Sequence, residues 1–489
     1  MNWTSFVDQG IPSSYQTALE NALQETIERW KQVSGANIRP TYGGTTTATS
    51  GGAQEIVVIM LGTDPQGGSG ILARSNGNLH RIEFYRRFST GQNIPWIFGW
   101  PTDPDPQYGY EIQAVAMHEY GHMLGLERHS DTGRATMGQG CSGSYVWVNS
   151  RLGPNTDDIT RLRNLYGVFT GFRVGTRRST DNGLTWAYIY NGLKADSTVT
   201  TTIEPGAVRD SGSVWVLAFS NPNKNVEFIV SGSEGFDSII RRATIAGMTS
   251  MYGVSIGGED GEWMVAAVDP SLDDMRIRVK YTNNSGQTWS SRDPPLTDID
   301  GAQRRSLGTP SVVRSASNTN TWYLAYPVLD TQYPDRTGWV IALKSTNDGV
   351  TWATEWPAYT AEEMSTGTGV SVAHLPSATD VPVALSRTTY NSDKYTQYAV
   401  RFSSQTLDPL TGIASSTLQS MMRPSLGRNN AGYVYLAVTK KGTNELITSR
   451  RSSGDTDWLT NVSAGVYPSV GPAVAADKNL ANIYIYYFY

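Results

Sequence analysis

The stretch HEYGHMLGLERHS, residues 118–130, contains three of the five histidines of this chain. It overlaps a helix predicted over residues 110–124. Residues four positions apart lie on one face of a helix, so His118 and His122 can bind one metal ion. Glu119 lies beside this pair and can take a proton from metal-bound water. The stretch therefore predicts a catalytic zinc centre that needs one more protein ligand, because such sites use three and leave the fourth position open.

Gly125 provides a way to bring in the third ligand. A residue without Cβ adopts the left-handed conformation that ends a helix and turns the chain back toward the metal. His129 follows in the sequence and is the expected third ligand, with Glu127 and Asp131 as alternative oxygen donors. Arg128, the residue before His129, keeps its charge and cannot coordinate zinc.

The elements around the motif predict an α+β domain that ends near residue 168. Apolar residues at spacings of three and four predict a long first helix, and a last helix begins with acidic residues and is followed by Gly167. Two apolar runs read as strands, separated by a loop rich in glycine. In chain order these are the helix 12–34, the strand EIVVIML (55–61), the loop GTDPQGGSG (62–70), the strand LHRIEFYRRF (79–88) and the helix within NTDDITRLRNLYG (155–167).

The pattern HExxHxxG followed by another histidine resembles the signature of the metzincin zinc proteases, in their matrixin-like form. That signature places the third ligand three residues after the glycine, where this chain has Arg128. The resemblance therefore implies one extra residue in the turn after Gly125, so that His129 reaches the metal. The segment RATMGQG supplies Met137 for the tight Met-turn that underlies the zinc site in this family, and the last helix looks like the closing helix of its catalytic domain.

The resemblance implies a zinc-dependent endopeptidase with one catalytic Zn²⁺ and a protein or peptide substrate. Zinc lowers the pKa of its bound water from about 16 to near 7, Glu119 accepts the proton, and the hydroxide attacks the scissile carbonyl. Tyr145 is a candidate for stabilising the oxyanion, although an exposed loop tyrosine is the simpler interpretation. No motif specifies a structural Ca²⁺. Cys141 follows the zinc motif and is poorly placed to keep the enzyme latent.

From about residue 170 the chain is rich in short β segments and carries a repeat. The copies recur roughly every 50 to 60 residues, a period typical of propeller blades. Each copy predicts a hairpin in which the side chain of an Asp or Asn forms hydrogen bonds with the backbone of its own turn. In the same hairpin a glycine takes a positive φ and a tryptophan packs between blades. Clear copies are STDNGLTW (179–186), TNNSGQTW (282–289) and STNDGVTW (345–352), and weaker ones lie at 231–238, 402–409 and 452–458.

A second signal, a short opening before a β run, interleaves with the turn repeat. Five openings are followed by a turn box of their own, whereas the sixth is followed by the C-terminus and the box at 179 has no opening before it. The segment around the box at 179 and the C-terminal segment after the sixth opening are therefore expected to form one blade together. This blade would close a six-bladed ring and hide its sheet edges. The openings are EPGAV (204–208), MYGVS (251–255), TPSVV (309–313), TGTGVSV (366–372), RPSLG (423–427) and YPSVG (467–471).

These turn boxes resemble the Asp-box of sialidase-like propellers over most of residues 170–489. No catalytic residue of sialidases can be carried over, because the segment GFRVGTRR is only a distorted match to their early arginine motif. The predicted organisation is thus a protease domain, residues 1–168, and a propeller, residues 169–489, that binds protein or glycan targets. The alternatives are a glycan-binding or sialidase-like propeller with an accessory first domain, and two binding modules whose zinc site is lost.

Composition excludes several classes of protein. The formal net charge is −5 and no run of Lys and Arg predicts binding to nucleic acid. The single cysteine rules out an intrachain disulfide, and no window approaches the roughly 18 apolar residues of a membrane span. The N-terminus shows no leader, so secretion is implied by the family resemblance alone; the alternatives are a cytoplasmic protein or an effector delivered by a secretion apparatus. His80 and His374 are expected to be ordinary surface or core histidines.

Overall fold

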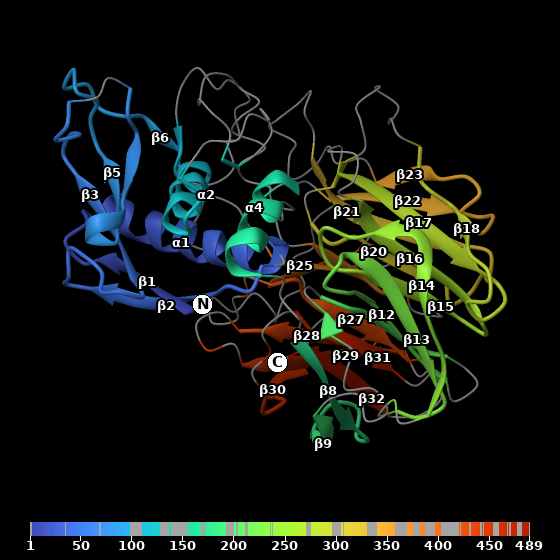
Figure 1. Ribbon diagram of the computed structural model, residues 1–489. Helices are drawn as coiled ribbons and strands as arrows, with labels where there is room; N and C mark the ends of the chain where they lie inside the picture. The colour runs from blue at the N-terminus through green and yellow to red at the C-terminus, as the bar shows by residue number, and fades with distance from the viewer. Residues whose placement is uncertain are drawn as a thin grey trace. The chain divides into compact units, whose positions relative to one another are not determined.

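The computed structural model divides into two compact units, Met1–Phe169 and Thr170–Tyr489, which are drawn together in Figure 1 and treated separately below. The structure describes residues 2–34, 36–67, 70–97, 110–127, 136–137, 154, 156–167, 172–191, 200–201, 204–210, 214–234, 236, 238–269, 275–295, 305–306, 308–329, 340–356, 369–374, 382–386, 397–401, 420, 422–429, 432–440, 443, 445–452, 459–466, 468, 471–476 and 482–488. No described helix is both long and apolar enough to span a bilayer.

The first unit is built on a five-stranded sheet with the order β2-β1-β3-β5-β4. All neighbouring strands run parallel except β4, which pairs antiparallel with β5 and forms one edge. Five consecutive residues of β3 are buried, as expected for a central strand covered on both faces. The strands are β1 (Asn2–Asp8), β2 (Arg39–Thr46), β3 (Glu55–Leu61), β4 (Ala73–Asn76) and β5 (Arg81–Tyr85).

Three helices of the first unit confirm the predicted ones, with small changes at their ends. They are α1 (Ser13–Ser34), α2 (Ile112–Met123) and α4 (Thr156–Tyr166). The predicted start of the second helix instead forms β7 (Tyr110–Glu111), which pairs with β6 (Trp96–Ile97); the short helix η1 (Gly77–Leu79) precedes β5. The Trp30 indole of α1 donates a hydrogen bond to the Met117 carbonyl of α2 at 3.0 Å, and both side chains are fully buried.

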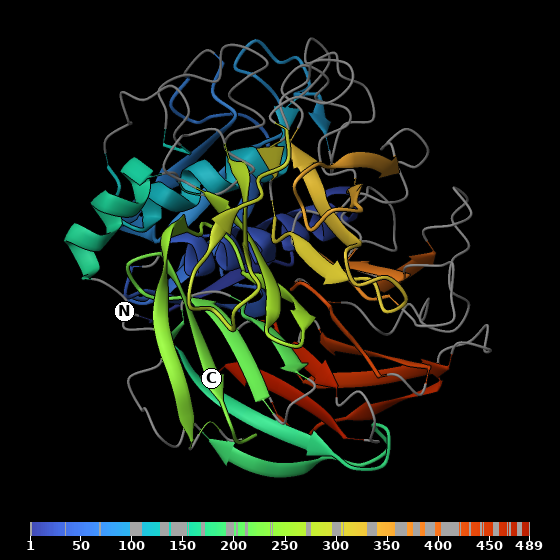
Figure 2. The same ribbon diagram turned by 90° about the vertical axis from the view of Figure 1, so that its right-hand side faces the viewer.

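The second unit contains five hydrogen-bonded sheets among its described residues, arranged like the blades of a propeller around a common centre (Figure 2). The first comprises β8 (Phe172–Ser179), β9 (Ala187–Asn191), β10 (Thr200–Thr201), β31 (Ala473–Ala476) and β32 (Ile483–Phe488). The second comprises β11 (Gly206–Asp210), β12 (Val214–Ser220), β13 (Asn225–Ser231) and β14 (Ile239–Thr249).

The remaining sheets of this unit have nine, three and four strands. The nine-stranded sheet comprises β15 (Ser255–Glu259), β16 (Glu262–Asp269), β17 (Arg276–Thr282), β18 (Ser290–Ser291), β19 (Arg305–Ser306), β20 (Ser311–Arg314), β21 (Trp322–Leu329), β22 (Val340–Ser345) and β23 (Ala353–Trp356). The other two comprise β24 (Val370–Val372), β25 (Pro382–Ser386) and β26 (Gln397–Arg401), and β27 (Ser425–Arg428), β28 (Tyr433–Thr439), β29 (Leu446–Ser452) and β30 (Leu459–Ser463). The count of six blades stays a prediction.

The predicted pairing of the two ends of the propeller is confirmed. β8, the first strand of the second unit, pairs antiparallel with β32, and the register runs from Ser179 opposite Ile483 to Val174 opposite Phe488. β31 extends the same sheet on the other side of β32. The sheet is thus completed by segments about 300 residues apart, and neither strand leaves its hydrogen-bonding groups at an open edge.

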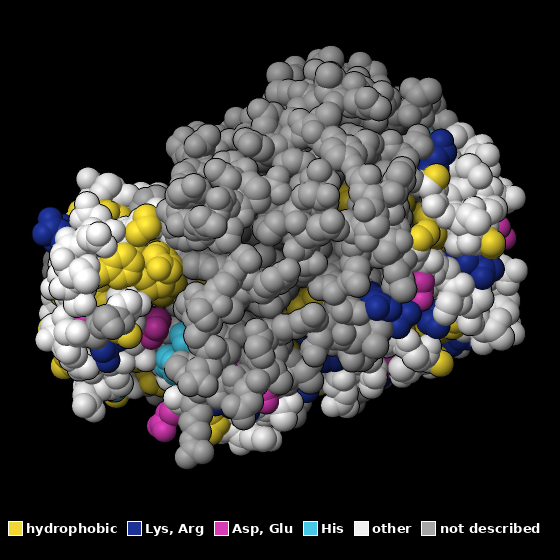
Figure 3. Space-filling view, turned by 90° about the horizontal axis from the view of Figure 1, so that it is seen from above, with side chains coloured by type: hydrophobic (Ala, Val, Ile, Leu, Met, Phe, Trp, Pro, Cys, Tyr) yellow, Lys and Arg dark blue, Asp and Glu magenta, His cyan; other side chains and the backbone are white. Residues whose placement is uncertain are grey.

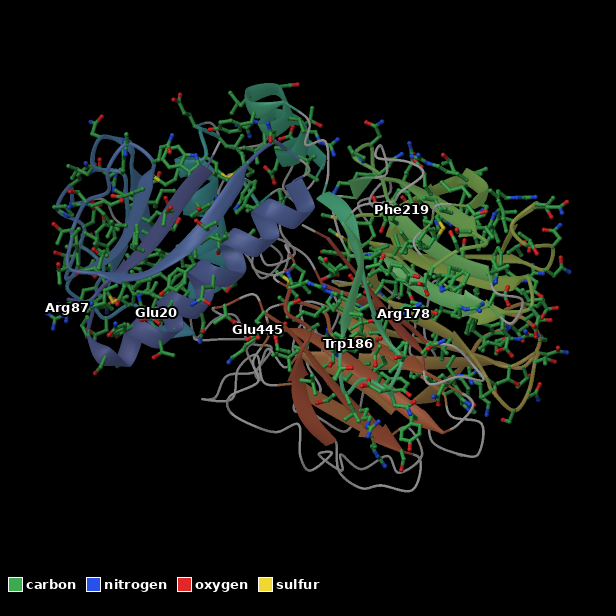
Figure 4. All side chains as sticks on the ribbon, turned by 90° about the horizontal axis from the view of Figure 1, so that it is seen from below. Glu20, Arg87, Arg178, Trp186, Phe219 and Glu445 are labelled. Atoms are coloured by element: carbon green, nitrogen blue, oxygen red, sulfur yellow. The ribbon has the colours of Figure 1, made fainter. Side chains whose placement is uncertain are left out.

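The first turn box has the predicted geometry. The Asp181 carboxylate accepts hydrogen bonds from the Thr185 amide and hydroxyl at 2.9 and 2.6 Å, and Gly183 has a φ of 83°. The Trp186 indole donates to the Thr448 hydroxyl at 2.9 Å, which ties this hairpin to β29 of the neighbouring sheet (Figure 4). In the boxes around Asn284 and Asn347 the Asn carbonyl likewise accepts from a threonine amide, while the Asn amide donates to the threonine hydroxyl, so the repeat serves the fold.

Candidate active site

His118 and His122 lie one helical turn apart on α2, with ring centroids 4.9 Å from each other. Nδ1 of His118 is 2.8 Å from the Thr136 carbonyl oxygen, and Nδ1 of His122 is 2.8 Å from the Leu126 carbonyl oxygen. A carbonyl only accepts, so each Nδ1 carries the proton and each Nε2 carries the lone pair that a metal binds. Two half-buried imidazoles oriented in this way fit a zinc ion.

The turn after α2 brings the Leu126 carbonyl to the His122 imidazole. Gly125 has a φ of 88°, and its amide donates to the His122 carbonyl at 2.9 Å, while the Leu126 amide donates to the Gly121 carbonyl at 3.1 Å. These bonds reverse the chain and turn the Leu126 carbonyl toward the imidazole. The structure therefore gives Gly125 the helix-ending conformation that was predicted from the sequence.

Glu119 is half-buried beside the two histidines and faces the edge strand β4. Burial raises the pKa of its carboxyl to about 7, and this effect is partly opposed by hydrogen bonds from the amide and hydroxyl of Ser75 and by the positive charge of Arg74. Arg74 itself forms an ion pair with Asp64 at 2.9 Å. Sequence reasoning missed Ser75 and Arg74, because β4 follows a glycine-rich loop and has too few residues for a clear alternation.

Met137 lies fully buried beneath α2, and its role in a Met-turn stays a prediction. A Cβ added to Gly121 would come within 2.2 Å of its sulfur, so a larger residue at that place on the helix would force Met137 to move. The preceding residue, Thr136, accepts the hydrogen bond of His118 and donates its amide to the Asp158 carboxylate at 2.9 Å. Asp158 was read from the sequence only as an acidic residue in the first turn of a helix, and its contact with this loop is tertiary.

The structure thus brings together His118, Glu119, His122, Gly125 and Met137. Glu127 is described and exposed. His129, the expected third ligand, lies outside the described residues, together with Arg128, Asp131, Cys141 and Tyr145. Within the described part of the chain, no group of three metal-binding side chains occurs. In Figure 3, histidine side chains of the first unit reach the surface beside an acidic side chain and a hydrophobic patch.

A second candidate site is a pocket in the second unit, lined by β11, β15, β20, β24, β27 and β31. Serine hydroxyls join successive lining strands: they accept amide hydrogen bonds across the pairs Ser255–Val312, Ser311–Val372, Ser371–Leu426 and Ser425–Val474. The lining also includes Arg209, Arg314, Arg423 and Arg428. Arg314 pairs with Glu262, and Arg428 lies 3.8 Å from Glu259. Such a surface offers charged and polar hydrogen-bonding groups to a ligand.

Comparison with a family model matches a segment within the first unit. Residues 15–167 match the model of the Matrixin family, a family of metallopeptidases. The first unit is thus similar to the Matrixin family, and the second has a propeller-like arrangement of sheets. A sequence comparison with curated proteins gives no match.

Three solved structures similar to the chain have low sequence identity to it. A single-site mutant of the Aleuria aurantia lectin, in complex with Fucα1-6GlcNAc, is 11% identical, with 58% of this chain and 87% of that chain covered and a TM-score of 0.40. The Hadza microbial sialidase Hz136 is 12% identical, with 58% and 64% covered and a TM-score of 0.41. AofleA from Arthrobotrys oligospora is 7% identical, with 65% and 83% covered and a TM-score of 0.41.

Proposed function

We propose that the first unit is a zinc-dependent endopeptidase with His118, His122 and His129 as zinc ligands and Glu119 as the proton acceptor. The observation that carries this proposal is the pair of half-buried imidazoles on α2, each with Nδ1 held by a backbone carbonyl. An imidazole that only filled the core would not need a second imidazole one turn away with its Nδ1 held in the same manner. The matrixin match over residues 15–167 supports the same reading.

The sheet supports a peptide as the substrate. β4 is an edge strand of its sheet and pairs on one side with β5. Ser75 of this strand contacts Glu119, so the edge lies beside the candidate catalytic carboxylate. An extended peptide that adds to the edge of β4 would bring its own carbonyl groups past Glu119.

Bound zinc would supply Lewis acidity to a water molecule and to the scissile carbonyl. Glu119 takes the proton from the water and returns it to the leaving amine. Thr136 and Leu126 hold Nδ1 of His118 and of His122, so Nε2 would be the ring nitrogen with which each histidine binds zinc. Ser75 holds the carboxylate of Glu119 toward the edge strand on which the peptide would lie.

Hydrolysis of an unstructured protein by the full chain and by Glu119→Ala, with the zinc content of both, tests this function. Cleavage by the wild type and zinc-loaded inactivity of the variant would support it. Absence of zinc from the wild type would refute it. A parallel His129→Ala variant tests the third ligand: it should lose zinc, whereas Glu127→Gln should keep it.

For the second unit we propose a six-bladed propeller of the Asp-box type that binds a protein or glycan target. Six strands support the blade count, because β11, β15, β20, β24, β27 and β31 each contact the next and β31 contacts β11. On this view the nine-stranded sheet is two blades joined through β19. The polar pocket supports the binding role, and screening the full chain against an array of glycans tests it.

We also propose that the protein is secreted, because the first unit is similar to the Matrixin family. Detection of the mature chain outside the producing cell tests this proposal.

A further inference from the structure

We infer that Tyr166 is a positioning residue for His122, which it reaches through the turn that ends α2; the inference rests on the proposed zinc site. Tyr166 is the last residue of α4, and its hydroxyl donates a hydrogen bond to the Leu124 carbonyl at 2.9 Å. Leu124 is the first residue after α2 and lies 42 positions earlier in the sequence. The bond therefore joins the last helix of the unit to the beginning of the turn.

The turn transmits this constraint to the imidazole. Leu124 is followed by Gly125, in the left-handed conformation, and by Leu126, whose carbonyl oxygen lies 2.8 Å from Nδ1 of His122. Three successive peptide groups thus connect the tyrosine hydroxyl to the atom that orients His122. Holding the Leu124 carbonyl limits how far the Leu126 carbonyl can rotate. The reason is that the amides of Gly125 and Leu126 both donate hydrogen bonds back to α2 and so fix the residues of the turn.

The side chains at the end of α4 also pack on the turn. A Cβ added at Gly125 would lie 3.5 Å from the Tyr166 hydroxyl and 3.6 Å from a methyl group of Leu165. The end of α4 is itself fixed, because the Gly167 carbonyl accepts a hydrogen bond from the Asn37 amide at 2.9 Å. Tyr166 is therefore held on a rigid support, which is what a residue needs to act on a ligand at a distance.

Tyr166→Phe is the appropriate change, since it removes the hydroxyl and keeps the ring. Tyr85→Phe is the matched control: the Tyr85 hydroxyl also donates a single hydrogen bond within the first unit, to Glu83 at 2.9 Å, and it does not touch the turn. Two quantities are measured on the full chain. One is the zinc dissociation constant by competition with a chelator, and the other is the exchange rate of the Gly125 and Leu126 amides in the metal-free protein.

We expect Tyr166→Phe to weaken zinc binding by about 10- to 100-fold, the range for groups that orient a metal ligand. The two amides should exchange at least several-fold faster, and Tyr85→Phe should change both quantities less than twofold. Zinc affinity within twofold of wild type in Tyr166→Phe, or equal weakening by the control, would overturn the inference. Wild-type protein that binds no zinc would instead refute the proposed function, and the amide exchange would still report whether Tyr166 holds the turn.

Discussion

Asp158 and His118 are connected through the backbone of a single residue, Thr136. The Thr136 amide donates to the Asp158 carboxylate at 2.9 Å, and the Thr136 carbonyl oxygen lies 2.8 Å from Nδ1 of His118. Asp158 is fully buried. A carboxylate on α4 thus holds the residue whose carbonyl orients a candidate zinc ligand on α2. In this way α4 acts on both histidines, on His118 through Asp158 and on His122 through Tyr166.

Removing this carboxylate should weaken the metal site. We expect Asp158→Ala to reduce zinc affinity by about 10- to 100-fold and to lower the free energy of unfolding by about 1–3 kcal/mol, since the Thr136 amide loses its buried acceptor. Asp158→Asn keeps an oxygen in place and should lose much less. Chelator competition and denaturant unfolding measure the two effects, and equal losses in the two variants would argue against the hydrogen bond as the cause.

Replacing the candidate proton acceptor should separate binding from chemistry. Glu119→Gln keeps the shape of the side chain and cannot accept a proton, so we expect peptide hydrolysis to fall about 10²- to 10⁴-fold with zinc content unchanged. Glu20→Gln on α1 of the same unit (labelled in Figure 4) is the control and should retain full activity. The rate of cleavage and the bound zinc are measured on the same samples. Residual activity near wild type in Glu119→Gln would assign the proton transfer elsewhere.

Glu204 is a buried acid of the second unit that contacts the pocket-lining residue Arg423. Glu204 accepts hydrogen bonds from the Thr309 hydroxyl at 2.8 Å and the Arg423 amide at 3.2 Å, and burial lowers the pKa of the Arg423 guanidinium to about 10 while the charge of Glu204 opposes this. Glu204→Ala leaves Arg423 buried without this carboxylate, so we expect a loss of about 3–5 kcal/mol in the free energy of unfolding. Denaturant titration measures it, with Thr309→Val as a milder comparison. A loss below about 1 kcal/mol would contradict the prediction.

His374 should make the propeller sensitive to acid. It is buried, stacks on Tyr323 at 5.3 Å and accepts a hydrogen bond from the Ala316 amide; burial, with the charges of Arg428 and Lys344, lowers its pKa from 6.5 to about 4. Between these values the unfolded chain binds the proton more readily, so stability falls as pH drops from about 6.5 to about 4, by up to about 3 kcal/mol.

His374→Phe removes this titration, so its unfolding free energy should vary less over the same pH range. Denaturant unfolding at a series of pH values compares the two proteins. Parallel pH profiles for wild type and variant would show that other groups cause the acid sensitivity.

Strong local patterns allowed much of the fold to be predicted. The spacing of apolar residues in α1 and the apolar run of β3 are features of single segments, and the turn boxes repeat often enough to show how the last strand pairs with β8. β1 and β2 were missed because polar and glycine residues interrupt them, and their pairing with β3 depends on the whole sheet.

The same distinction applies to the site. His118, Glu119, His122 and Gly125 lie within eight positions, so their relationship follows from helical geometry. Ser75, Asp158 and Tyr166 contribute from β4 and α4, and nothing in their local sequence shows which distant atoms they contact. Partnerships of this kind arise from tertiary packing and need coordinates.

The pairing of β8 with β32 has a consequence for the order of events during synthesis. β8 leaves the ribosome about 300 residues before its partner, which at ~5–20 residues per second is an interval of roughly 15–60 s. The described strands of the first unit have all been made by then, whereas β8 must wait as an unpaired edge that other chains could capture. The nascent second unit therefore needs protection for longer than the first unit made before it.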